Sequence, residues 1–124
     1  SDLRDLLERE DTDIRAAEAV ALFCYRIGKE IGALAAALGG LDTLVFAGGI
    51  GENSSEIRSR ICVGLDFLGI LFDEMRNSAG AAVISADISP VTVRIIRTDE
   101  DVVIANAVFA VLDASADPRP GPGG

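Results

Sequence analysis

Three glycines follow a short apolar run in the stretch DTLVFAGGIGENSSEIR, residues 42–58. The run TLVFA is typical of a strand that is buried on both faces of a parallel sheet. Directly after the glycines come polar residues suited to the start of a helix. A strand that turns through glycines into a helix is a feature of α/β layer architectures, so this stretch indicates an α/β fold.

A long amphipathic helix is predicted over residues 13–38, where small and apolar residues recur at steps of three and four. The Gly39-Gly40 pair ends it, because glycine adopts left-handed backbone geometry at little cost. Gly28 and Gly32 lie one turn apart and allow another element to approach this helix closely. The expected apolar stripe contains Ile14, Ala17, Ala21, Cys24, Ile27 or Gly28, Ile31, and Leu34 or Ala35.

After the glycines a second helix is expected, with Asn53 as its N-cap and Glu56 completing a variant of the capping box. Ile57, Ile61 and Leu65 form its apolar stripe, and the helix is expected to run to about residue 68, where Gly69 stops it.

Beyond residue 69 the pattern predicts mostly loop over 70–81, a short strand at 82–85 and a strand at 89–97. A last helix is predicted over 99–114. The tail, residues 115–124, is rich in proline and glycine and is expected to be disordered.

Composition excludes several classes of function. The chain has 124 residues, 49% of them hydrophobic, which is enough for one domain with a core. Its formal net charge of -9 repels DNA and RNA, although a small nucleotide can still be bound through backbone N–H groups and a metal ion. It contains no histidine, which removes the usual general base and most zinc sites.

Two isolated cysteines, Cys24 and Cys62, are predicted to be reduced thiols in the core, which indicates a cytoplasmic protein. No apolar run approaches the roughly 20 residues needed to span a membrane, and no secretory leader is visible. The chain starts at Ser1 without a methionine, directly in a charged helical pattern, and is therefore expected to be a processed or truncated piece.

The glycines have three possible roles. A P-loop requires a lysine that is not present near Gly51. The dinucleotide pattern GxGxxG fails at Ser54, which stands where the third glycine belongs. The third role, a tight strand-to-helix turn with no ligand, remains open. Because the glycines lack Cβ atoms, such a turn also lets a phosphate approach the backbone.

Three motifs kept in order resemble the acetate kinase (acetate/propionate kinase) family: SDLRDL, then DTLVFAGGIGENSSEIRSRICVGLDFLGI, then RIIRTDED. The resemblance spans nearly all of residues 1–113. It implies an actin-like ATPase (ribonuclease H-like) α/β fold, present here as an incomplete C-terminal portion over residues 1–114, with the tail at 115–124.

The resemblance also implies site residues. It places Asp2, Leu3 and Arg4 at the adenosine pocket and Glu100 at magnesium. It places the glycine segment beside the adenosine and phosphates; this segment consists of Gly49, Ile50, Gly51, Glu52 and Asn53. From chemistry alone, Asp2 and Arg4 could be first-turn helix charges, Asn53 only a cap, and Asp99 or Asp101 could replace Glu100. The implied cofactors are ATP/ADP and Mg²⁺.

The activity implied for the full-length parent is the reversible reaction of ATP with acetate to give ADP and acetyl phosphate. No residue of this chain matches the family's catalytic or acyl-binding groups, so the isolated chain is expected to be inactive and a short-chain carboxylate is expected to bind only in the parent. A homo-oligomer is expected, without nucleic-acid or membrane partners. The alternative is a non-catalytic interaction or dimerisation module of the same fold.

Overall fold

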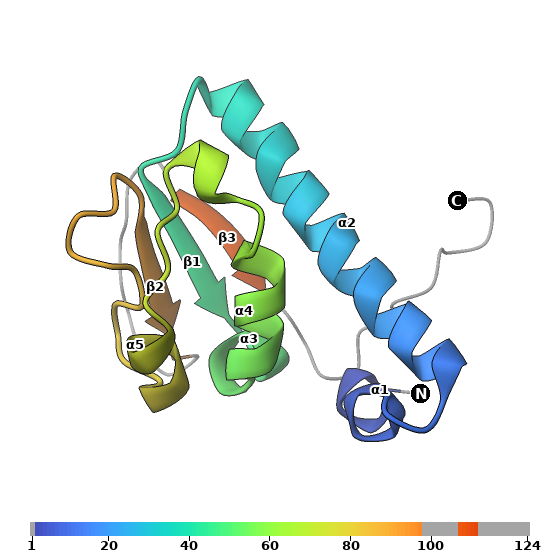
Figure 1. Cartoon of the computed structure of the whole chain (residues 1–124). Helices are drawn as coiled ribbons and strands as arrows, with labels where there is room; N and C mark the ends of the chain where they lie inside the picture. The colour runs from blue at the N-terminus through green and yellow to red at the C-terminus, as the bar shows by residue number, and fades with distance from the viewer. Residues whose placement is uncertain (1, 98–106, 112–124) are drawn as a thin grey trace.

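The computed structural model describes residues 2–97 and 107–111. Within them, β1 (Thr43–Ala47), β2 (Thr92–Ile96) and β3 (Ala107–Val111) form a parallel sheet in the order β2-β1-β3 (Figure 1). The central strand β1 pairs on both sides, with Phe46 opposite Ile95 and Ala110. Parallel strands combined with helices confirm the predicted α/β class.

The apolar face of this sheet forms the core with two helices, α2 (Ile14–Leu38) and α4 (Ser55–Cys62). Side chains in register on neighbouring strands point to this face, and they pack in one cluster with buried residues of both helices; the strand residues are Leu44, Phe46, Val93, Ile95, Val108 and Ala110. A Cβ built on Gly28 of α2 would lie 3.7 Å from the carbonyl oxygen of Ile61 in α4, an ordinary van der Waals contact, and Gly32 has no neighbour within 4 Å, so the packing of α2 requires glycine at neither position.

Helix α2 confirms the predicted long helix and its boundaries. Asp13 caps its start, accepting hydrogen bonds from the backbone N–H groups of Arg15 and Ala16, and Gly39 ends it with a φ of 76°. The predicted stripe is confirmed at Cys24, Ile31 and Ala35 but is wrong in the first half of the helix, where Ile14 is 72% exposed and the buried residues are Ala16, Val20 and Phe23. In an alanine-rich helix more than one face is apolar, and the contact with the sheet selects among them. None of the helices that the structure describes is long and apolar enough to cross a membrane.

The predicted single helix from Asn53 to residue 68 is wrong. A short helix, α3 (Gly49–Asn53), begins directly after Gly48, and α4 follows it with Ser54 as N-cap, whose Oγ accepts from the N–H of Ile57 at 3.2 Å. Asn53 therefore ends one helix instead of capping the next. Helix α4 stops at Cys62, and a 3₁₀ turn, η1 (Asp66–Leu68), precedes Gly69.

Three further predictions beyond residue 69 need correction. Residues 70–81 contain a helix, α5 (Glu74–Ala79), which Asp73 caps and Gly80 ends with a φ of 65°. Residues 82–85 form only isolated bridges, whereas β2 confirms the strand within 89–97. Residues 107–111, which were predicted to be part of a helix over 99–114, form strand β3. The sequence AVFAV suits a strand as well as a helix, and pairing with β1 selects the strand. The predicted disordered tail lies outside the described residues.

Both cysteines are free and buried in the structure, as predicted. Burial raises the pKa of Cys24 to about 11 and that of Cys62 to about 12, so both are neutral thiols at physiological pH.

We expect both thiols to resist alkylation at pH 8 in the folded chain and to react after unfolding in urea. The raised pKa values also predict that stability falls as pH rises from about 8.5, where unfolded thiols ionise, through the folded values. Urea melts at pH 7 and pH 10 would measure the decline. A variant with both cysteines changed to alanine should decline less, and rapid labelling of the native protein would contradict this prediction.

Candidate functional site

The sharp turn between β1 and α3 occurs at Gly48. Its φ of 75° and ψ of 153° lie in a region that is essentially restricted to glycine. Gly49 and Gly51, the glycines that the sequence analysis selected, are helical residues of α3; the first is exposed and the second buried. Gly48, one of the three glycines after the predicted strand, was not among the predicted site residues, although its position as the first of them was a usable signal.

Helix α3 places its side chains in different environments. Ile50 is buried in the core, and Asn53 is exposed, with its Nδ2 donating to the carbonyl oxygen of Gly49 at 2.9 Å. Glu52 is only 9% exposed, and its Oε1 is buried without a hydrogen-bond partner among the residues that the structure describes. An unpaired buried carboxylate oxygen is costly in an apo protein and suits a site that accepts a donor or a cation.

The N-terminal segment contributes to the site through Arg4. A pocket of about 270 Å³ lies between α1 (Leu3–Arg9) and α3, and its lining is Arg4, Leu7, Glu8, Ile50, Asn53 and Ser54. The structure thus brings together three of the predicted residues from two distant segments. The other two residues predicted in the N-terminal segment have structural positions: Asp2 caps α1 by accepting from the N–H of Asp5 at 3.0 Å, and Leu3 is fully buried.

Two arginines that sequence reasoning missed hold the carbonyl end of α3. Arg58, in α4, donates from Nη1 to the carbonyl oxygens of Gly51 and Glu52, each at 3.0 Å. Arg97 donates from Nη1 to the same oxygen of Glu52 at 2.8 Å. Burial, and secondarily the charge of Arg97, lowers the pKa of Arg58. The sequence pattern of α4 does not predict that Arg58 is buried, because Arg58 is a charged residue next to the apolar stripe of the helix and not part of it.

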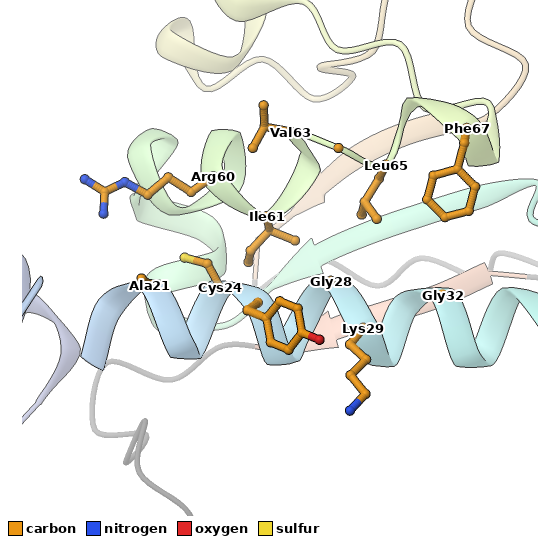
Figure 2. A pocket seen from close by; sticks show the side chains of 12 residues that line it. Ala21, Cys24, Gly28, Lys29, Gly32, Arg60, Ile61, Val63, Leu65 and Phe67 are labelled. Carbon is orange, nitrogen blue, oxygen red and sulfur yellow. The ribbon is translucent and has the colours of Figure 1, made fainter. Parts of the chain in front are cut away.

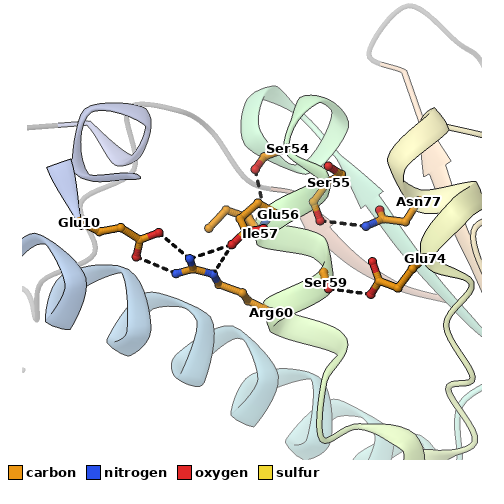
Figure 3. A network of polar contacts seen from close by, with 9 residues as sticks. All are labelled: Glu10, Ser54, Ser55, Glu56, Ile57, Ser59, Arg60, Glu74 and Asn77. Atoms are coloured by element: carbon orange, nitrogen blue, oxygen red, sulfur yellow. Dashed lines mark hydrogen bonds and ion pairs between the residues drawn. The ribbon is translucent and has the colours of Figure 1, made fainter. Parts of the chain in front are cut away.

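An ion network ties α4 to α1 (Figure 3). Arg60 binds both carboxylate oxygens of Glu10, from Nη1 at 2.9 Å and from Nη2, and its Nε donates to Glu56 at 2.9 Å. On the other side of α4, Ser59 donates to Glu74 and Asn77 donates to the carbonyl oxygen of Ser55. The hydrogen bond from Arg60 lowers the pKa of Glu10. These contacts fix α4 between the C-terminal end of α1 on one side and α5 on the other.

We expect Glu10→Gln to cost about 1 kcal/mol of stability at pH 7, the usual scale of a partly exposed ion pair. Because the pKa of Glu10 is lowered in the folded state, its contribution is present above the unfolded value of about 4.3 and is lost as pH falls through the folded value. Melts of both proteins at pH 7 and pH 3 should therefore differ more at pH 7 than at pH 3. The more exposed Glu56, changed to glutamine, should cost less; an equal gap at both pH values would contradict this prediction.

A larger pocket, of about 590 Å³, lies between α2 and α4 and contains none of the predicted site residues. Its walls include Gly28, Ile61, Leu65 and Phe67, and Figure 2 shows the side chain of Lys29 extending away from the space between the helices. No carboxylate from residues 2–97 or 107–111 lines it. The pocket between α1 and α3 therefore remains the candidate site, although it is smaller.

A metal site was predicted at Glu100, which lies outside the described residues. Among the residues that the structure does describe, no group of three or more His, Cys, Asp or Glu could hold a metal ion. Magnesium at a nucleotide site usually takes only one or two carboxylates, with water and phosphate oxygens completing its shell. The unpaired Oε1 of Glu52 is an oxygen of the required kind.

A parallel α/β sheet with a glycine segment and a pocket at its strand-to-helix junction defines the class of site, and comparison with known proteins defines the family. Residues 1–106 match the model of the Acetokinase family. The acetate kinase of Rhodopseudomonas palustris (strain TIE-1) is 51% identical over 114 residues, which are 90% of this chain and 28% of that protein. The chain belongs to the Acetokinase family.

Solved structures agree with this assignment. The chain resembles the acetate kinase of Porphyromonas gingivalis with a TM-score of 0.73 and 42% identity over 79% of this chain and 26% of that one. It resembles a propionate kinase from Francisella tularensis with a TM-score of 0.70 and 32% identity over 78% of this chain and 25% of that one. Its fold is accordingly part of the actin-like ATPase fold of acetate kinases, and it spans about 28% of the length of the relatives it matches.

Proposed function

We propose that this chain is the nucleotide-binding C-terminal part of an ATP:acetate phosphotransferase, which converts ATP and acetate reversibly into ADP and acetyl phosphate. Membership of the Acetokinase family supports the reaction. The observation that carries the role of this part is the pocket between α1 and α3, where Arg4, Ile50 and Asn53 meet.

The size of the pocket fits part of a nucleotide. At about 270 Å³ it is just below the roughly 300–1,000 Å³ of ligand pockets that enclose a whole small molecule. We assign it to the adenosine, with Ile50 as an apolar wall and Arg4 and Asn53 as polar groups. The exposed Gly49 then lies where a phosphate can approach the backbone without meeting a Cβ atom.

Magnesium is part of this proposal, because the net charge of -9 opposes a polyphosphate. Glu100 is the proposed magnesium-associated acid, and Glu52 offers a second oxygen. When bound, the metal neutralises phosphate charge. The residues of this chain would hold the nucleotide, whereas the carboxylate acceptor is assigned to the parent protein.

The alternative is a non-catalytic interaction module in a homo-oligomer. Exposed apolar side chains favour it, in particular Val63 and Phe67, which are each 77% exposed.

Calorimetric titration of the chain with ADP and Mg²⁺ tests the proposal. We expect measurable binding that Arg4→Ala and Asn53→Ala each weaken about three- to tenfold, which corresponds to roughly 0.7–1.4 kcal/mol. Arg15→Ala, an exposed change on α2, is the control and should leave the Kd unchanged. Absence of binding at millimolar ADP would contradict the proposal and favour the module.

A further inference from the structure

Arg58 joins two elements that the chain separates. It is 2% exposed, and its Nε donates to Oδ1 of Asn77 at 2.7 Å while its Nη2 donates to the carbonyl oxygen of Asn77 at 3.1 Å. Its Nη1 donates to the carbonyl oxygens of Gly51 and Glu52 in α3. The planar guanidinium is thus oriented by Asn77 on one side and directed at the backbone of α3 on the other.

Helix α3 depends on such external contacts. It has only five residues, and helices this short are not stable on their own hydrogen bonds. Its last carbonyl groups have no partners within the helix. Arg58 and Arg97 supply those partners, since together they donate three hydrogen bonds to the oxygens of Gly51 and Glu52.

The buried charge itself indicates a positional role. In the part of the chain that the structure describes, neither Arg58 nor Arg97 has a carboxylate within ion-pair distance. Burying an arginine costs desolvation that an apolar side chain of similar size would avoid. What an arginine provides and an apolar side chain cannot is a fixed set of donors aimed at the negative, carbonyl end of α3.

We propose that Arg58 is a positioning residue for nucleotide binding: through the carbonyl groups of Gly51 and Glu52 it holds α3 so that Gly49 and Asn53 face the nucleotide. This inference rests on the proposed function, because it assigns Arg58 to the same site. Arg58 itself is buried behind α3 and acts only through that helix.

Three variants separate positioning from general stability. Arg58→Met keeps much of the side-chain volume and removes every donor. Arg58→Lys keeps a buried cation but cannot span Asn77 and α3 at once, and it serves as the conservative variant if the methionine variant does not fold. Arg76→Met is the matched control, because Arg76 also donates to a carbonyl oxygen, that of Ser85, but does not contact α3.

Hydrogen exchange on the ligand-free 124-residue chain is the first measurement. The amides of Glu52 and Ser54, bonded to the carbonyl oxygens of Gly48 and Ile50, report on α3. We expect Arg58→Met to lower protection there at least tenfold more than in α2, with Arg58→Lys intermediate and Arg76→Met unchanged. An equal loss of protection in α2 and α3 would overturn the inference.

Binding of ADP with Mg²⁺ is the second measurement. We expect a Kd at least tenfold weaker for Arg58→Met, an intermediate value for Arg58→Lys, and a value within twofold of the unmodified chain for Arg76→Met. Unchanged binding in both Arg58 variants would overturn the inference. If the unmodified chain does not bind ADP, the proposed function fails, and the exchange measurement alone decides whether Arg58 positions α3.

Discussion

No acetyl phosphate above the enzyme-free background is the expected result when the purified 124-residue chain is incubated with ATP, acetate and Mg²⁺ in a hydroxamate assay. Phosphoryl transfer depends on holding donor and acceptor in line and neutralising charge between them. Effective molarities on the order of 10⁵–10⁸ M are available only when both are positioned. The proposed site of this chain would hold only the donor, and the sequence contains no histidine to act near the transferring group.

Two controls make this result interpretable. The acetate kinase of R. palustris, at the same concentration, should give rapid hydroxamate formation. A chimera of that enzyme, in which residues 1–114 of this chain replace the matching segment, should be active, because the two sequences are 51% identical over 114 residues. Enzyme-like turnover by the chain alone would contradict the prediction.

Gly48→Ala should destabilise the chain by about 1–3 kcal/mol, the cost of forcing a Cβ into a backbone region restricted to glycine. For a domain of this size that is a loss of roughly 5–20 °C in Tm. Because α3 begins at the next residue, we also expect ADP binding to weaken more than Tm alone would explain. Thermal melts and ADP titration below the Tm measure the two effects.

The matched control is Gly32→Ala. Gly32 lies within α2 with no neighbour within 4 Å of a built Cβ, so the same substitution should stabilise the chain by about 0.5–1 kcal/mol. A Tm for Gly48→Ala equal to that of the unmodified chain would show that the turn relaxes without strain and would contradict the prediction.

Much of the candidate site followed from the sequence through the resemblance alone. The motifs SDLRDL and GGIGEN identified two segments some distance apart, and the structure places Arg4, Ile50 and Asn53 from these segments around one pocket. Glu100 stays a prediction, because it lies outside the described residues. Arg58 and Arg97 could not be found in this way, since their role depends on carbonyl groups that only the fold brings near them.

The sequence by itself determined the elements that local chemistry defines: the ends of α2 at Asp13 and Gly39, the strand β1 and the α/β class. Local signals suffice there because a cap or a left-handed glycine acts within a few residues of its own position. Only the tertiary structure decided which face of α2 is buried, that Ser54 and not Asn53 caps α4, and that residues 107–111 pair with β1. In each of these cases the sequence is compatible with two local arrangements, and contacts with distant residues select one of them.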